Sequence, residues 1–235
     1  KFRENSVKMK NLFAKAALML LISLSLKAQK TTCGAELSMQ KQGLQEVTEQ
    51  VPSVLVELKY ATMDNFMKKD VYGCLTHAYL QKETVAMLKK AQENLEKAHP
   101  GYHLLIYDAA RPLSKQWELW NTLTQYTPEK RRTYVADPKE HSIHNYGSAI
   151  DLTVADEKGK PLEMGTKYDF FGEMAYPKEE ARLLKAGKLS AKALANRLIL
   201  RKAMTQAGFM PIEYEWWHFN AFSRKVAKQM FQVVP

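Results

Sequence analysis

The chain has 235 residues and a formal net charge of +10 at pH 7, with 46% apolar and 26% charged residues. This balance is that of a globular protein, and it excludes a disordered chain or a coiled coil as the main state. The length fits one domain, or one domain with a small appendage. Two cysteines are too few for a disulfide-rich scaffold or for a structural zinc site made of cysteines alone.

The first 28 residues have the pattern of a few upstream residues followed by a secretory signal peptide. Met9 opens a basic stretch, the apolar run 16–26 follows, and Lys27 and Ala28 close the segment. Because this run is shorter than the ~20 residues that span a bilayer, a membrane anchor is disfavoured; a buried N-terminal helix is the other alternative. We therefore expect export to the periplasm, no stable membrane span in the mature chain, and a cleavage site that the sequence leaves open.

Export changes the meaning of the positive charge. Residues 1–28 hold six Lys or Arg and one Glu, a net +5, so about half of the total +10 lies in the predicted signal peptide. The remaining charge is spread along the chain without a basic block or an aromatic-interleaved stripe. Nucleic acid is therefore not an expected partner.

Both cysteines, Cys33 and Cys74, follow the predicted signal peptide. An oxidising compartment would permit a disulfide bond between them, and two free thiols are the alternative. Lipid anchoring at Cys33 is not expected, because the preceding Lys30-Thr-Thr lacks the apolar residue typical of such a site.

The predicted elements mix strands and helices without a regular βαβ rhythm, which favours an α+β fold. Residues 29–53 are expected to be an N-terminal lead-in, and residues 54–235 a single domain. Strands are predicted over residues 54–60, 102–107, 149–154 and 213–219, and helices over 81–98, 113–125, 189–207 and after 219. The helix over 81–98 is amphipathic, with apolar residues three or four apart, and His99-Pro100-Gly101 ends it.

Two histidines stand in a pattern that suits metal binding. His144 lies on a glycine turn, Asp151 lies on the strand that follows, and His218 comes three residues after Glu215. Two imidazoles and one carboxylate form a zinc ligand set that leaves a fourth position for water. A satisfied polar cluster is the alternative, and a straight strand would point residues 215 and 218 to opposite faces. The other histidines have weaker patterns: His141 lies beside this site, and ordinary residues surround His77, His99 and His103.

The pattern Ser142-x-His144-x-x-Gly147-x-Ala149-x-Asp151, together with Glu215-x-x-His218, resembles the D-alanyl-D-alanine dipeptidases. These are zinc enzymes of the D-Ala metallopeptidase group, which shares its fold with hedgehog signalling domains. Other blocks fall in the family's order over about residues 54–220: Leu58–Phe66, Asp108–Pro112, Met164–Phe170 and Ala207–His218. The resemblance implies a hedgehog-like α+β domain in which helices flank a small antiparallel sheet.

The resemblance also implies which residues carry the chemistry. The zinc ligands of the family match His144, Asp151 and His218, so one Zn²⁺ per chain is expected. Its general base matches Glu215, and its transition-state arginine matches Arg111, which would face the oxyanion. Without the resemblance, Arg111 before a proline would be an equally good partner for a salt bridge in a turn.

Three further residues correspond to the substrate-binding residues of the family. Tyr60 and Asp169 match the pair that holds the ammonium group of the dipeptide, and Ser142 matches a hydroxyl near the metal. From the residues alone, Asp169 would be an ordinary loop acid and Ser142 a helix cap. The segment from Glu173 to Lys178 departs from the family pattern, which leaves the depth of the pocket open.

These features predict zinc-dependent hydrolysis of the small dipeptide D-Ala-D-Ala to free D-Ala, in cell-wall turnover or scavenging. One alternative is a peptidoglycan D,D-carboxypeptidase or endopeptidase on the same fold. Another is a non-catalytic binding module that keeps the zinc, against which Glu215 and Arg111 argue. A role in glycopeptide resistance would need hydrolysis of the cytoplasmic pool, so the signal peptide favours scavenging. The sequence makes no prediction about the oligomeric state.

Overall fold

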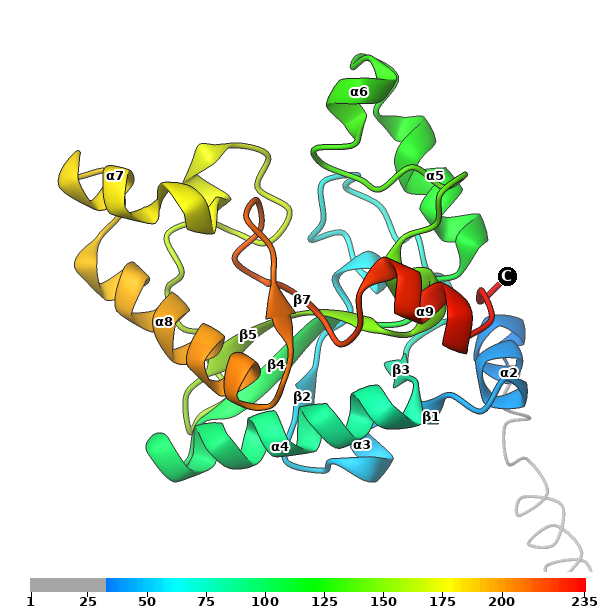
Figure 1. The fold of residues 1–235 in the computed structure, drawn as a ribbon, viewed down its shortest axis with the longest axis horizontal. Coiled ribbons are helices and arrows are strands. Elements are labelled where there is room, and N and C mark those ends of the chain that lie inside the picture. Colours follow the sequence, from blue (N-terminus) through cyan, green and yellow to red (C-terminus); the bar gives the residue numbers. More distant parts are fainter. Residues whose placement is uncertain (1–32) are drawn as a thin grey trace, which may run out of the picture. The chain divides into compact units, whose positions relative to one another are not determined.

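A five-stranded sheet runs through the computed structural model, which describes residues 33–235 (Figure 1). The predicted signal peptide, residues 1–28, lies outside the described residues. In spatial order the strands are β2 (Leu55–Val56), β4 (His103–Asp108), β5 (Ala149–Ala155), β7 (His218–Asn220) and β6 (Met210–Pro211). The pairs from β4 to β6 are antiparallel, as predicted, whereas β2 joins β4 in parallel. The α+β class is therefore confirmed, with one parallel pair at the edge of the sheet.

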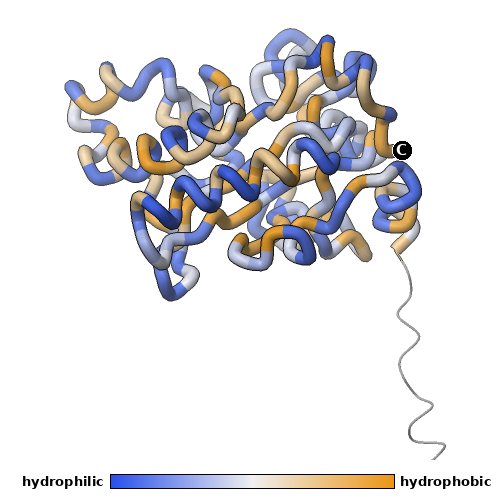
Figure 2. The backbone as a smooth tube through the Cα atoms, turned by 60° about the horizontal axis from the view of Figure 1, so that its bottom comes forward, coloured by the Kyte–Doolittle hydropathy of each residue, from blue (hydrophilic) through white to orange (hydrophobic). Residues whose placement is uncertain are grey.

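Two long helices cover one face of this sheet. Helix α4 (Lys82–Ala98) and helix α8 (Ala191–Gln206) contact each other, and they contact β4 and β5 respectively. Apolar and polar residues alternate along α4 (Figure 2), and the apolar side buries Leu88, Ala91 and Leu95. Because side chains alternate along a strand, Ile150 and Leu152 of β5 point to one face and Asp151 to the other. The helices predicted over 81–98 and 189–207 are confirmed, and among residues 33–235 none of the helices could span a bilayer.

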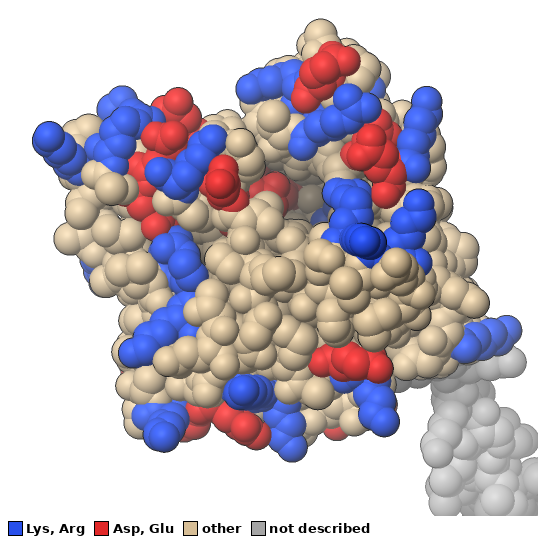
Figure 3. All heavy atoms as spheres, viewed as in Figure 1, with Lys and Arg blue, Asp and Glu red and all other residues tan. Residues whose placement is uncertain are grey.

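Two arms extend beyond the sheet on either side of a hollow in the surface (Figures 1 and 3). The α5–α6 arm consists of α5 (Leu113–Thr122) and α6 (Pro128–Arg131). The α7 arm consists of the short helices η3 (Glu173–Ala175) and η4 (Pro177–Glu179) and of α7 (Glu180–Lys185). The helix predicted over 113–125 is thus present but ends at Thr122. The last helix, α9 (Arg224–Met230), contacts the turn η2 (Ile143–Tyr146) that carries His144.

The N-terminal part of the described chain has structure of its own. It contains α2 (Gly34–Lys41), β1 (Gln45–Glu46), which pairs with β3 (Tyr79–Leu80), and α3 (Val47–Gln50). Cys33 and Cys74 form a disulfide bond, so the bridge that the sequence left open is present. This bond ties the start of α2 to the loop between η1 (Lys59–Ala61) and β3.

Two predicted strands are much shorter than expected. The strand over 54–60 ends at Val56, because the carbonyl of Tyr60 accepts hydrogen bonds from the backbone of Val71 and Tyr72 instead of from a neighbouring strand. The strand over 213–219 begins only at His218, and the two residues before it, Trp216 and Trp217, are both buried. Trp216 and Trp217 lie in a turn, so β7 starts only after them.

Candidate active site

Three functional groups form a row across the sheet. Asp151 of β5 is the direct cross-strand partner of His218 on β7 and of Asp108 on β4. The pairing of β4 with β5 shifts by one residue between Ile106 and Asp108, so Tyr107 is the extra residue of a bulge. This shift sets Asp108, rather than Tyr107, opposite Asp151.

His144 reaches the same row from the turn η2. Ser142 caps this turn by accepting a hydrogen bond from the backbone of His144, and Gly147 ends it with a φ of +64°. Any side chain at Gly147 would be strained at this φ, and its Cβ would lie 2.8 Å from Leu44. The imidazole of His144 donates from Nδ1 to the carbonyl of Ala109 at 2.8 Å, which leaves Nε2 free to bind a ligand.

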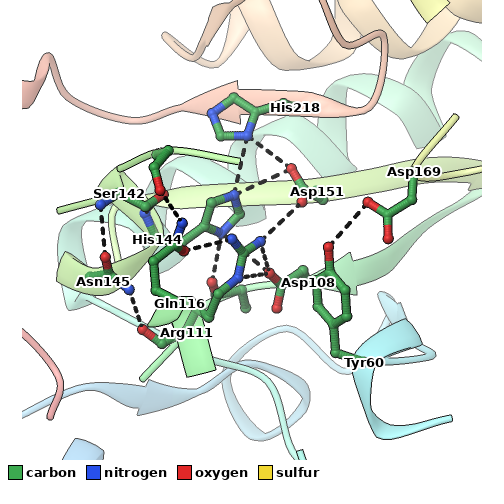
Figure 4. A network of polar contacts seen from close by, with 12 residues as sticks. Tyr60, Asp108, Arg111, Gln116, Ser142, His144, Asn145, Asp151, Asp169 and His218 are labelled. Carbon is green, nitrogen blue, oxygen red and sulfur yellow. Dashed lines mark hydrogen bonds and ion pairs between the residues drawn. The ribbon is translucent and has the colours of Figure 1, made fainter. Parts of the chain in front are cut away.

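The side chains of His144, Asp151 and His218, here called the His-Asp-His cluster, converge on one point (Figure 4). Nε2 of His144 lies 3.1 Å from Nδ1 of His218 and 3.3 Å from Oδ1 of Asp151. Nδ1 of His218 lies 2.9 Å from the same Oδ1 of Asp151. His218 donates from Nε2 to Asn220, so Nδ1 presents a lone pair, as Nε2 of His144 does.

The donor set of this cluster fits zinc. Nε2 of His144, Nδ1 of His218 and Oδ1 of Asp151 are all acceptors, because the proton of each imidazole lies on its other nitrogen. Three acceptors this close together repel one another unless a cation lies between them. Ligand atoms bound tetrahedrally to zinc at about 2.0–2.1 Å lie about 3.3 Å apart, close to the spacing found here. When no cation lies between them, His144 and His218 would have to be protonated toward Asp151, and in that state they hold its pKa well below its usual value although burial alone would raise it.

Arg111 is held next to this cluster by buried polar groups. Its Nε and Nη2 donate to Oδ2 of Asp108 at 2.9 and 2.5 Å, and Nη1 donates to Gln116 at 2.8 Å. The backbone of Arg111 donates to the carbonyl of His144, and Asn145 donates to the carbonyl of Arg111, which links the arginine to the turn η2. A guanidinium has five N–H groups, and residues 33–235 occupy three of them. Two N–H groups therefore remain for a ligand.

Glu215 lies on the turn just before β7. Its Oε2 is 3.9 Å from Nδ1 of His218, so the two side chains share one site. This is possible because the strand β7 begins only at His218, and Glu215 is therefore not held to the alternation of a strand. Burial raises the pKa of Glu215 to about 8; His218 opposes this shift, and the negative charges of Asp151 and Asp169 add to it. A carboxylate with a raised pKa beside an expected metal-bound water is placed to accept a proton.

Asp169 provides a second negative charge in the site. Its Oδ1 accepts a hydrogen bond of 3.1 Å from the hydroxyl of Tyr60, while Oδ2 is buried without a partner among the described residues. Asp169 has a φ of +58°, which Asp tolerates better than most residues. Burial and the nearby charge of Asp151 raise its pKa to about 8. A cationic group of a ligand would supply the missing partner.

The eight site residues predicted from the sequence line one cavity, which has a volume of about 80 Å³. They are Tyr60, Arg111, Ser142, His144, Asp151, Asp169, Glu215 and His218. Ser142 both caps the turn η2 and lines the cavity. His141 does not line it, and its Nδ1 instead lies 3.0 Å from the hydroxyl of Tyr146. The sequence left open whether the segment around Tyr176 shapes the pocket. Tyr176, in the α7 arm, packs on Tyr214 and does not line the cavity.

Several residues of the site were not predicted. Tyr134, Val135 and Ala136, which follow α6, line the cavity, as does Trp217. No motif marked Tyr134, Val135 or Ala136, because only the path of the chain after α6 brings them to the cavity, whereas Trp217 lies in the block Ala207–His218. Asp108 was visible three residues before Arg111, and this spacing was the available signal for an ion pair.

Comparisons with known proteins show the family of this chain. A family model described as D-ala-D-ala dipeptidase matches residues 40–235. The chain belongs to this family. The match includes every residue of the cavity, and the expected resemblance is therefore confirmed.

Curated relatives within the D-Ala-D-Ala dipeptidase family come from several bacteria. The chain is 37% identical to a D-alanyl-D-alanine dipeptidase of Escherichia coli strain K12, over 72% of this chain and 79% of the relative. It is 33% identical to that of Enterococcus faecalis V583, over 73% and 88% of the two chains. It is 34% identical to that of Enterococcus faecium, over 75% and 90%.

Proposed function

We propose that this protein is a zinc-dependent dipeptidase that hydrolyses D-Ala-D-Ala to two molecules of D-Ala. The observation that carries the proposal is the combination, in one cavity, of the His-Asp-His cluster with an unpaired buried carboxylate at Asp169. A metal-binding set suits hydrolysis of a peptide bond, and a buried carboxylate suits a free ammonium group. The names of the curated relatives supply the substrate.

The ammonium end of the substrate is assigned to Asp169 and Tyr60. The two residues are joined by a hydrogen bond at Oδ1, so Oδ2 remains to accept from the ammonium group. A substrate with an acylated amine has no charge at this position and would leave the carboxylate unpaired. Only a substrate with a free amino group next to the scissile residue therefore satisfies this part of the cavity.

Zn²⁺, when bound by His144, Asp151 and His218, would polarise a water molecule and the scissile carbonyl. Glu215 takes the proton of the attacking water and then gives it to the nitrogen of the leaving D-Ala. Glu215 lines the same cavity as the His-Asp-His cluster, and a carboxylate can accept a proton from water and then return it as a carboxylic acid.

Arg111 is assigned to the oxyanion that forms as the carbonyl is attacked. Its side chain lines the cavity, and Asp108 and Gln116 hold three of its N–H groups, so the guanidinium is oriented before the substrate arrives. Ser142 also lines the cavity, and we assign its hydroxyl to substrate binding near the metal.

We further propose that the protein is exported to the periplasm and that it scavenges dipeptide released by wall turnover. The signal-peptide pattern in residues 1–28 supports export, and so does the Cys33–Cys74 disulfide, because such bonds persist in oxidising compartments. A test of this part is N-terminal sequencing of the protein from a periplasmic extract. The chain beginning near Gln29 is the expected form, and an uncleaved chain in the cytoplasm would contradict export.

The decisive experiment compares three substrates with the purified protein, with and without a chelator. D-Ala-D-Ala should be cleaved, and cleavage should stop on chelation. Losing one partner of a buried charged pair costs on the order of 2–5 kcal/mol, so N-acetyl-D-Ala-D-Ala should be cleaved at least ~30-fold less efficiently. A stem pentapeptide ending in D-Ala-D-Ala should be refused for the same reason. Equal cleavage of all three would replace the dipeptidase proposal with a D,D-carboxypeptidase.

A further inference from the structure

The two oxygens of Asp151 have different partners. Oδ1 faces the His-Asp-His cluster, at 2.9 Å from Nδ1 of His218 and 3.3 Å from Nε2 of His144. Oδ2 points the other way and accepts a hydrogen bond of 3.0 Å from the hydroxyl of Tyr168. The nearest cation to Oδ2, Nη2 of Arg111, is farther away, at 3.8 Å. The hydroxyl of Tyr168 is therefore the group that engages Oδ2 directly.

The ring of Tyr168 is fixed by other aromatic rings. Its centroid lies 5.4 Å from those of Tyr107 and Trp217 and 6.0 Å from that of Tyr60. Such edge and tilted contacts orient a ring and restrict its motion. The position of the Tyr168 hydroxyl is therefore fixed. Its acceptor, Asp151, is fixed as well, because it lies in the strand β5.

We propose that Tyr168 is a positioning residue for the metal: its hydroxyl holds Oδ2 of Asp151 away from the cluster, so that Asp151 binds the metal through Oδ1 alone. This inference rests on the zinc site of the proposed function and names a role for one further residue. A carboxylate can bind a metal through one oxygen or two, and partners of the second oxygen decide between these modes. Binding through one oxygen keeps the fourth position of a tetrahedral zinc for water.

The neighbouring residue gives this arrangement a further consequence. Asp169 follows Tyr168 directly and is bonded to Tyr60, so one short segment contacts both the metal ligand Asp151 and the proposed ammonium site. The hydroxyl of Tyr168 contacts Asp151, and Tyr168 is not among the residues that line the cavity. Its loss should therefore lower kcat and leave KM for D-Ala-D-Ala nearly unchanged.

The test compares Tyr168→Phe with Tyr107→Phe. Each variant loses one hydroxyl from the same aromatic group, but only Tyr168 donates to Asp151. Zinc affinity is measured by competition with a coloured chelator, and coordination by the visible absorption of the Co²⁺-substituted protein. Tyr168→Phe should bind zinc ~10–100-fold more weakly, as is typical when a partner of a metal ligand is lost. Its cobalt bands should weaken as a second oxygen raises the coordination number, whereas Tyr107→Phe should match the wild type in both.

Unchanged zinc affinity and an unchanged cobalt spectrum in Tyr168→Phe would overturn the proposal. A second measurement uses the wild type and so does not depend on whether the variant folds. X-ray absorption of the zinc-loaded wild type should find four nearest ligand atoms. Coordination of the zinc by both oxygens of Asp151 would overturn the proposal. Failure here is distinct from failure of the proposed function. If only the role of Tyr168 is wrong, the wild type still binds zinc and cleaves D-Ala-D-Ala. If the proposed function is wrong, the wild type does not.

Discussion

The hydroxyl of Tyr60 donates a hydrogen bond of 3.1 Å to Oδ1 of Asp169, which lies 109 residues later in the chain. The other oxygen of Asp169 is buried and has no partner among residues 33–235. An isolated buried acceptor destabilises the folded protein, so this site is built at the expense of stability. The same oxygen is available to a ligand that carries a positive charge.

Replacing Asp169 with Asn should stabilise the metal-free protein at pH 8. The pKa of Asp169 is raised from 3.8 to about 8, so the folded state binds more protons than the unfolded state between these values. The stability of the wild type therefore falls as the pH rises from about 4 to about 8. Asn carries no charge, and αL backbone suits it, so Asp169→Asn should gain roughly 1–3 kcal/mol at pH 8.

Thermal or urea unfolding of the chelated protein at pH 4 and pH 8 measures this effect. At pH 4 the carboxyl is neutral in the folded state, so the two proteins should unfold alike. The variant should also lose most of its preference for free over N-acetylated dipeptide, chiefly by cleaving the free one more slowly. A variant that is less stable than the wild type at pH 8 would contradict the role given to burial.

Glu215→Gln should remove turnover and keep the metal. The amide has nearly the same shape, but it cannot accept the proton of the attacking water, so kcat should fall by roughly 10²–10⁴-fold. Zinc content should remain that of the wild type, because Glu215 is not among the three residues of the cluster. His141→Ala serves as the matched variant and should keep both zinc and turnover, since that residue does not line the cavity. Normal turnover in Glu215→Gln would assign the base elsewhere.

Metal analysis should find about one zinc ion per chain. Asp151→Ala and His218→Ala should each lose it, because either change leaves only two ligands. Chelation should abolish hydrolysis in the wild type, and added Zn²⁺ should restore it. Full activity in a protein shown to be free of metal would contradict the assigned chemistry.

Asp108→Asn should destabilise the fold and weaken catalysis together. Asp108 is fully buried, and its loss leaves the guanidinium of Arg111 without a counter-charge, which costs about 3–5 kcal/mol in buried pairs. Asp137→Asn is the control, because Asp137 pairs with Arg132, which is half exposed, and such pairs contribute ~1 kcal/mol or less. Urea unfolding and kcat/KM of both variants check this prediction. Equal stability of the two variants would mean that Arg111 needs no buried partner.

Much of the fold could be predicted because its signals are local. The apolar spacing of residues 81–98 predicts helix α4, the apolar run 104–106 predicts strand β4, and the largely apolar stretch after Gly147 predicts strand β5. The glycine after His144 and the short distance to Asp151 mark one half of the site for the same reason. Such patterns depend only on residues within a turn or two of one another.

Tertiary structure decided how these pieces meet. The bulge at Tyr107 sets Asp108 opposite Asp151. Because β7 starts only at His218, Glu215 and His218 share a site, and residues 134–136 after α6 form one wall of the cavity. Each depends on contacts between residues far apart in the chain. A strand's register is set by its partner and by what packs on its faces, because a shift of one residue reverses every side chain. The sequence by itself therefore determined the family, the main elements and the set of reactive residues, and only the packing of distant segments decided which oxygens and nitrogens face one another.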